Sequence, residues 1–134
     1  ANQLAVAVVT PQAEVAKAAV DSVVAPSVMG QVTILPEHAP LLADLGPGVV
    51  ELRAASRADR FFISGGFLEV ERDRVVILAE TAEEVSGIDV ERARQDLSAA
   101  EAKLKNLDPT DPAYAAESAR LMRAQSRLQA AGQG

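Results

Sequence analysis

The sequence contains no cysteine and no tryptophan, and only 3% of its 134 residues are aromatic. Without cysteine the chain can form neither a disulfide framework nor a thiolate metal site, which fits a reducing compartment. A core with so few aromatic rings must be built from Val, Ile, Leu and Ala. This composition argues against a large, aromatic-lined ligand pocket.

Long hydrophobic runs and basic clusters are also missing. No run approaches the roughly 18 apolar residues of a membrane-spanning helix, and no basic segment opens the chain, so we expect no direct membrane insertion. The net charge is −6, and residues 1–86 carry six Lys or Arg against twelve Asp or Glu, whereas residues 87–134 carry seven against seven. Such an acidic first part argues against nucleic acid as a partner, because binding the phosphate backbone requires clustered basic groups.

The composition changes sharply near Gly87. Before this residue Val, Ile and Phe recur in short runs broken by Gly and Pro, whereas after it the only β-branched residues are Ile88, Val90 and Thr110. Strand-forming residues therefore give way to helix-forming ones. We predict a segregated α+β fold: an N-terminal all-β domain over residues 1–86, then a helical domain over residues 87–134.

The first part of the chain contains short apolar segments separated by turn signals. Pro26-Ser27 is expected to end a strand, Gly46-Pro47-Gly48 to form a turn, and Ser56 to Asp59 to form a polar link. Strands this short, with no helical period between them, favour a flattened two-layer sandwich or small barrel. The expected strands are residues 3–10, 14–19, 20–25, 28–35, 41–45, 49–53, 60–64, 67–71 and 74–80.

The second part has the periodicity of two packed helices. Asp111 and Pro112 are expected to be the N-cap and first residue of the second helix, and Gly132 its end. The two apolar stripes contain mostly Ala and a few Leu, so packing between the helices should stabilise them only modestly. We therefore predict an antiparallel two-helix hairpin that can open. The stripe positions are Val90, Ala93, Leu97, Ala100, Leu104 and Leu107 in the first helix, and Tyr114, Leu121, Ala124, Leu128 and Ala131 in the second.

Residue patterns typical of catalysis are lacking. His38 is the only histidine, and the carboxylates lack the spacing of metal ligands. The segment Ser64-Gly65-Gly66 is better explained as a bulge or tight turn than as a nucleophile elbow. We therefore predict that the chain alone is not an enzyme, has no catalytic or metal-binding residues and requires no cofactor.

Two features in the helical part leave alternatives open. Around the start of the first helix, Asp89 can act as an N-cap, which is a sufficient structural explanation. Alternatively, Arg92 and the first-turn amides could hold an anionic ligand. Arg120, Arg123 and Arg127 fall on one side of the second helix, either as an ordinary solvated face or as a cationic edge that docks on an acidic partner.

Four blocks of the sequence resemble the epsilon subunit of bacterial and chloroplast F-type ATP synthases. They are GQVTILPEHAPLL (30–42), FISGGFLEV (62–70), VILAET (76–81) and IDVERA (88–93). The resemblance covers nearly the whole chain in order, and its specificity comes from the blocks together. It implies a non-catalytic central-stalk subunit that couples rotation of the c-subunit ring to the catalytic head.

The resemblance also implies partners. The sandwich would contact the gamma subunit and the c-subunit ring, with Met29, Gln31, Pro36 and His38 at the edge near that ring. The helical arm would extend toward the alpha/beta catalytic head and hinder ATP hydrolysis, using the basic stripe Arg120, Arg123 and Arg127. The protein would lie peripherally on the cytoplasmic face of the bacterial inner membrane.

Some members of the family bind ATP when the helices are folded down, which implies a weak regulatory ATP site here. The matching residues are Glu83, Ile88, Asp89, Arg92 and Ala93. The sequence departs from the family pattern at Ala99, where ATP-binding relatives can have Arg, and at Gln31, Thr33 and Glu37 near the ring edge. Three hypotheses remain: a stalk subunit with a mobile arm, a nucleotide-sensing module, and a scaffold whose hairpin never opens.

Overall fold

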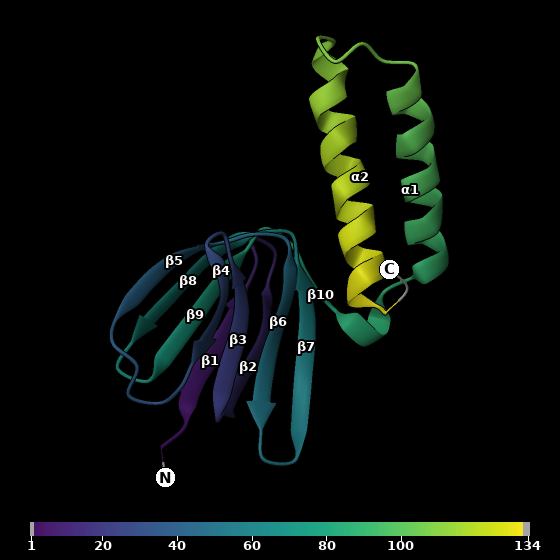
Figure 1. The fold of residues 1–134 in the computed structure, drawn as a ribbon. Coiled ribbons are helices and arrows are strands. Elements are labelled where there is room, and N and C mark those ends of the chain that lie inside the picture. The colour runs from purple at the N-terminus through teal and green to yellow at the C-terminus, as the bar shows by residue number, and fades with distance from the viewer. Residues whose placement is uncertain (1, 133–134) are drawn as a thin grey trace. The chain divides into compact units, whose positions relative to one another are not determined.

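The computed structural model describes residues 2–132 and divides the chain into two compact units, Ala1–Val85 and Ser86–Gly134 (Figure 1). All strands lie in the first unit and both α-helices in the second. The predicted segregation of β and α structure is therefore confirmed. The boundary between the units falls inside a single 3₁₀ turn, η1 (Val85–Gly87).

The first unit is built from strands of three to seven residues. Their order along the chain is β1 (Leu4–Val9), β2 (Glu14–Val20), β3 (Ser22–Ser27), β4 (Gly30–Ile34), β5 (Leu41–Leu45), β6 (Gly48–Ala54), β7 (Arg57–Ile63), β8 (Gly66–Glu71), β9 (Arg74–Ala79) and β10 (Ala82–Glu84).

The strands form two layers that are joined at one corner. The first layer has the order β10-β7-β6-β3 with β4 on the other side of β3, and the second has the order β5-β8-β9-β1-β2. The pair Ser27 and Leu45 is the only strand register pair between β3 and β5. All neighbouring strands run antiparallel except β1 and β9, which are parallel. This is the predicted sandwich.

Alternation along the strands creates the core between the layers. In β1, Leu4, Val6 and Val8 are buried whereas Ala5 is exposed, as expected when side chains point to opposite faces in turn. The same pattern recurs in β8, where Leu68 is buried. One cluster of buried aliphatic side chains, with Phe61, spans both layers. A sequence poor in aromatics thus fills the core with Val, Ile, Leu and Ala.

Two expectations about strand boundaries were wrong. The strand does not stop before Pro26-Ser27: both residues belong to β3 and pair with β4, and the Pro26 carbonyl accepts a hydrogen bond from the Gly46 N–H at 2.8 Å. Proline loses only its donor, so a strand tolerates it where the donor is not needed. Ser56 to Asp59 do not form a polar link, because β7 begins at Arg57 and pairs with β6 as far as Ala54.

The second unit consists of α1 (Val90–Lys105) and α2 (Pro112–Ala130). The Asp89 side chain accepts a hydrogen bond from the Arg92 N–H, and the Asp111 side chain accepts one from the Ala113 N–H, so both predicted N-caps are confirmed. Gly132 follows α2 with a φ of 80°, a conformation that glycine adopts without strain. Local signals therefore define both ends of α2.

The connection between the helices is stabilised by Asp108. Its carboxylate accepts hydrogen bonds from the Thr110 backbone N–H at 2.9 Å and from the Thr110 hydroxyl at 2.7 Å. The backbone bond first, and the hydroxyl bond second, hold the pKa of Asp108 below its usual value. The charged carboxylate thus favours the tight turn that starts α2.

We predict that Gly66→Ala destabilises the sandwich by about 3 kcal/mol, the sum expected for backbone strain and overpacking. Gly66 has a φ of 150°, and a Cβ placed there would lie 1.9 Å from the Leu78 carbonyl oxygen. Gly46→Ala is the matched control, because a Cβ there meets nothing within 4 Å. Urea unfolding of the full chain measures both variants, and equal midpoints would contradict the prediction.

Candidate functional site

The helical unit contains a strongly charged pocket of about 300 Å³. Residues of α1 and α2 both line it, so it depends on the two helices lying side by side. The lining residues are Arg92, Asp96, Arg120, Arg123, Ala124 and Arg127. Four guanidinium groups around one space make this pocket a strong candidate for binding an anion, and we call it the arginine pocket.

Helical spacing explains why these side chains gather. Arg120, Arg123 and Arg127 lie at i, i+3 and i+7 on α2, and Arg92 and Asp96 lie at i and i+4 on α1. Residues spaced in this way share a helix face. The three arginines therefore lie on one face of α2, as predicted. Within the hairpin they line a pocket that α2 shares with α1.

Next to the pocket, ion pairs join the two helices. Arg120 Nη2 on α2 lies 3.9 Å from Asp96 Oδ1 on α1, and Lys103 Nζ on α1 lies 3.4 Å from Glu117 Oε1 on α2. Within α2, Arg120 Nη1 lies 3.7 Å from the same Glu117 oxygen. The Glu117 side chain is only 16% exposed. Each such pair contributes little alone, but a connected set fixes how the helices face one another.

The residues implied for nucleotide binding divide between the units. Glu83 lies in β10, where it pairs with Phe62, and the other four lie at the start of the helical unit. Asp89 is occupied as the N-cap of α1, while Ala93 and Ile88 are buried. Of the five, only Arg92 lines the pocket.

The four residues implied for the ring edge do not form one patch. Met29 lies in the turn before β4 and is 93% exposed, and Gln31 is near the start of that strand. Pro36 and His38 follow the other end. Five residues of extended strand span roughly 13 Å, so β4 separates the two pairs. The sandwich thus presents two different ends, each with two of these residues.

The loop after β4 is held in place by the β8–β9 turn. Asp73 Oδ1 accepts a hydrogen bond from the Glu37 N–H at 2.6 Å. Glu37 itself has a φ of 67°, in the region that favours glycine. A glycine is common at this position in the family that the sequence resembles, and the backbone geometry gives the reason. Asp73 therefore positions Pro36 and His38.

An exposed apolar surface on the second layer was not predicted from the sequence. Leu42 on β5 is 70% exposed, and Phe67 on β8 and Leu78 on β9 are about half exposed. Phe67 pairs with Leu78, and strand alternation places all three on the outward side. We call this set the outer apolar face. The sequence contained a signal for the exposure of Phe67. Alternation along residues 67–71 puts Phe67 on the same face as Glu69, a charged residue that is expected to face solvent.

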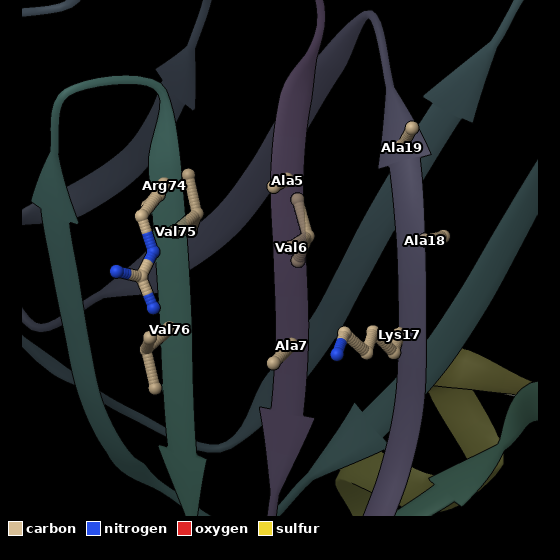
Figure 2. A pocket seen from close by; sticks show the side chains of 9 residues that line it. All are labelled: Ala5, Val6, Ala7, Lys17, Ala18, Ala19, Arg74, Val75 and Val76. Carbon is tan, nitrogen blue, oxygen red and sulfur yellow. The ribbon is translucent and has the colours of Figure 1, made fainter.

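Beside the outer apolar face, the same layer has a shallow groove of about 370 Å³ over β1 (Figure 2). Small side chains, among them Ala5 and Ala7, leave the space, and Lys17 of β2 and Arg74 of β9 come from the strands on either side. Ala7 pairs with Val76, which shares a face with Leu78. The groove, which we call the alanine groove, therefore continues the outer apolar face.

Within residues 2–132, no group of three or more His, Cys, Asp or Glu side chains is arranged to hold a metal ion. Across the same described residues, neither helix combines the length and apolar character needed to cross a membrane.

Solved structures share this fold. A chain of the Euglena gracilis mitochondrial ATP synthase, in a structure of OSCP/F1/c-ring, superposes with a TM-score of 0.76 at 21% identity, covering 99% of this chain and 79% of that one. A chain of the Tetrahymena thermophila mitochondrial ATP synthase central stalk/c-ring gives a TM-score of 0.67 at 20% identity, covering 96% of each. At such identities the likeness establishes the fold alone.

Sequence comparisons establish the family. The ATP synthase epsilon chain of Moorella thermoacetica is 48% identical over 126 residues, covering 93% of each chain. Epsilon chain 2 of Syntrophotalea carbinolica is 42% identical over 134 residues, covering 100% of this chain and 97% of the relative. The family model for the ATP synthase delta/epsilon chain β-sandwich domain matches residues 3–85, and that for its long α-helix domain matches residues 86–132. The chain therefore belongs to the ATP synthase delta/epsilon family.

Proposed function

We propose that the chain is a non-catalytic central-stalk subunit of a proton-translocating F-type ATP synthase, coupling rotation of the c-subunit ring to the catalytic head through gamma. The observation that carries this proposal is the match to both domains of the family, in order, over residues 3–132. Epsilon chains of several bacteria match over nearly their whole length. The subunit would lie peripherally, on the cytoplasmic face of the inner membrane.

The exposed apolar surfaces of the sandwich support binding to partner subunits. The outer apolar face and the alanine groove lie on the same face of one layer, with Glu69 between Leu42 and Val76. Exposed apolar side chains gathered on one face are typical of an interface. We assign this layer to gamma. The exposed tip around Met29, together with Gln31, is assigned to the c-subunit ring. Pro36 and His38, at the other end of β4, would contact the c-subunit ring separately from Met29 and Gln31.

The thin interior of the hairpin supports a mobile arm. Only Ala93, Ala100, Ala124 and Leu128 are buried along α1 and α2 in the described part of the chain. Opening the hairpin therefore costs little apolar burial. It would release the three α2 arginines from the pocket that they share with α1, so that they could meet acidic segments of the alpha/beta head and hinder ATP hydrolysis.

We predict that deleting residues 88–134 speeds ATP hydrolysis by the assembled complex about fivefold, near the lower end of ordinary coupling energies. The physical reason is loss of the arm that obstructs the head. Reconstituted complexes with the full or truncated chain are compared by initial hydrolysis rate, and co-purification with gamma checks that the sandwich is still incorporated. An unchanged rate with a fully incorporated sandwich would favour a plain scaffold instead.

We also predict that replacing Arg120, Arg123 and Arg127 together by Ala weakens inhibition without unfolding the sandwich, because the arm loses its cationic face. A charge-matched control replaces Arg72, Arg94 and Lys105, which lie outside the pocket lining and outside the ion pairs that join the helices, and should retain inhibition. Hydrolysis rates of the assembled complex are measured across a salt series, since screening weakens charge-based docking. Rates that do not change with salt, or equal effects of both triple variants, would rule out docking through this stripe.

A second candidate function is nucleotide sensing, in which ATP binds weakly at the arginine pocket and the start of α1 and favours the closed hairpin. The pocket supports this reading, because Arg92 of the IDVERA block lies there with three more arginines. A guanidinium group often binds phosphate through two parallel N–H···O hydrogen bonds. The N-cap function of Asp89 stands with or without a ligand.

We predict that millimolar ATP slows hydrogen exchange of α1 and α2 in the isolated chain, with a dissociation constant of about 1 mM, equivalent to about −4 kcal/mol. Arg92→Ala should abolish the effect because it removes a pocket guanidinium. Arg94→Ala, two residues along the same helix and outside the pocket lining, should preserve it. If exchange in the helices is unchanged at millimolar ATP, nucleotide sensing is excluded.

A further inference from the structure

Asp96 stands out because it is the only acid among the residues that line the arginine pocket in the described chain. Its Oδ1 lies 3.9 Å from Arg120 Nη2, and its side chain is 34% exposed. It follows Arg92 by one helical turn on α1, so its carboxylate is on the side that carries the pocket. A negative charge therefore already occupies the space where an anionic ligand would bind.

The charges in the pocket show what Asp96 does to a ligand. Four arginines and one aspartate give the lining a net charge of +3. Arg120 is further engaged by Glu117 at 3.7 Å. An incoming anion must share Arg120 with Asp96 and is repelled by its carboxylate. Because Coulomb repulsion scales with the ligand's charge, a polyphosphate is affected more than a single phosphate.

We propose that Asp96 is a resident counter-ion that keeps polyphosphate binding at this pocket weak and so sets the concentration range in which the hairpin responds. The proposal rests on the nucleotide-sensing candidate function and adds an affinity-determining residue to it. Asp96 also steadies the closed hairpin without ligand, because its charge offsets part of the repulsion among the four arginines.

The test is calorimetric titration of the full chain with sodium triphosphate and, separately, orthophosphate at low salt. Asp96→Asn removes the pocket carboxylate, and Glu101→Gln removes one charge from an exposed position on α1 outside the pocket lining. Triphosphate should bind Asp96→Asn about tenfold more tightly than the native chain, a gain of roughly the size expected for removing a partly screened charge at close range. Orthophosphate should gain less, and Glu101→Gln should change neither affinity by more than about twofold.

Two further variants protect the test against a folding defect. Asp96→Glu keeps the charge and should return triphosphate affinity toward the native value. Asp96→Ala removes the charge with a residue of higher helix propensity, and it replaces the Asn variant if far-ultraviolet circular dichroism shows lost helix. Tightening in both uncharged variants, but not in Asp96→Glu, supports the counter-ion role.

Each outcome has a defined meaning. If the native chain binds triphosphate and neither uncharged variant binds it more tightly, or if Glu101→Gln gains as much, the role of Asp96 is overturned while nucleotide sensing stands. If removing Asp96 tightens triphosphate binding but ATP does not bind, the counter-ion role stands and nucleotide sensing fails. Absence of triphosphate binding to the native chain and to every variant overturns the role of Asp96, and the hydrogen-exchange measurement with ATP then decides nucleotide sensing.

Discussion

The small buried interface between α1 and α2 is the constraint on which the functional account depends. Ala93, Ala100 and Ala124 each bury little beyond one methyl group, and Leu128 adds the only larger side chain buried along the two described helices. At about 0.8 kcal/mol per buried methylene, this interior stabilises the hairpin far less than the aliphatic core stabilises the sandwich. In the proposed function, the sandwich would be the rigid unit that transmits force, and the hairpin would be the unit that changes its conformation.

In the proposed function, charge determines which partner each conformation of the hairpin would bind. In the closed hairpin Arg120 contacts both Asp96 and Glu117, and together with Arg123 it lines a pocket shared with α1. An acidic partner and a bound polyphosphate would thus use the same guanidinium groups in different conformations of the arm. In the proposed function, binding one would exclude the other, so a ligand in the closed pocket would oppose docking on the head. This reciprocity is what linkage requires of two ligands that favour different states.

Local signals in the sequence were sufficient to predict the segregated fold and the helix ends, because Asp89 and Asp111 act on amides within three residues. Features that depend on distant partners could not be predicted. Pro26 continues β3 because it pairs with Gln31 of β4 and because its carbonyl accepts a hydrogen bond from the Gly46 N–H. The α2 arginines were recognisable as a stripe from their spacing, but the pocket required knowing which face of α2 meets α1.

The central claim is that the arm changes partners within a working ATP synthase, and site-specific crosslinking tests it most directly. The sequence has no cysteine, so Met122→Cys on the exposed side of α2 gives one attachment point for a photoactivated crosslinker. Mass spectrometry then identifies the crosslinked products during ATP synthesis and after the proton gradient is removed. The account predicts that products with gamma or the alpha/beta head form in one condition and decrease in the other. The same products in equal yield under both conditions would contradict it.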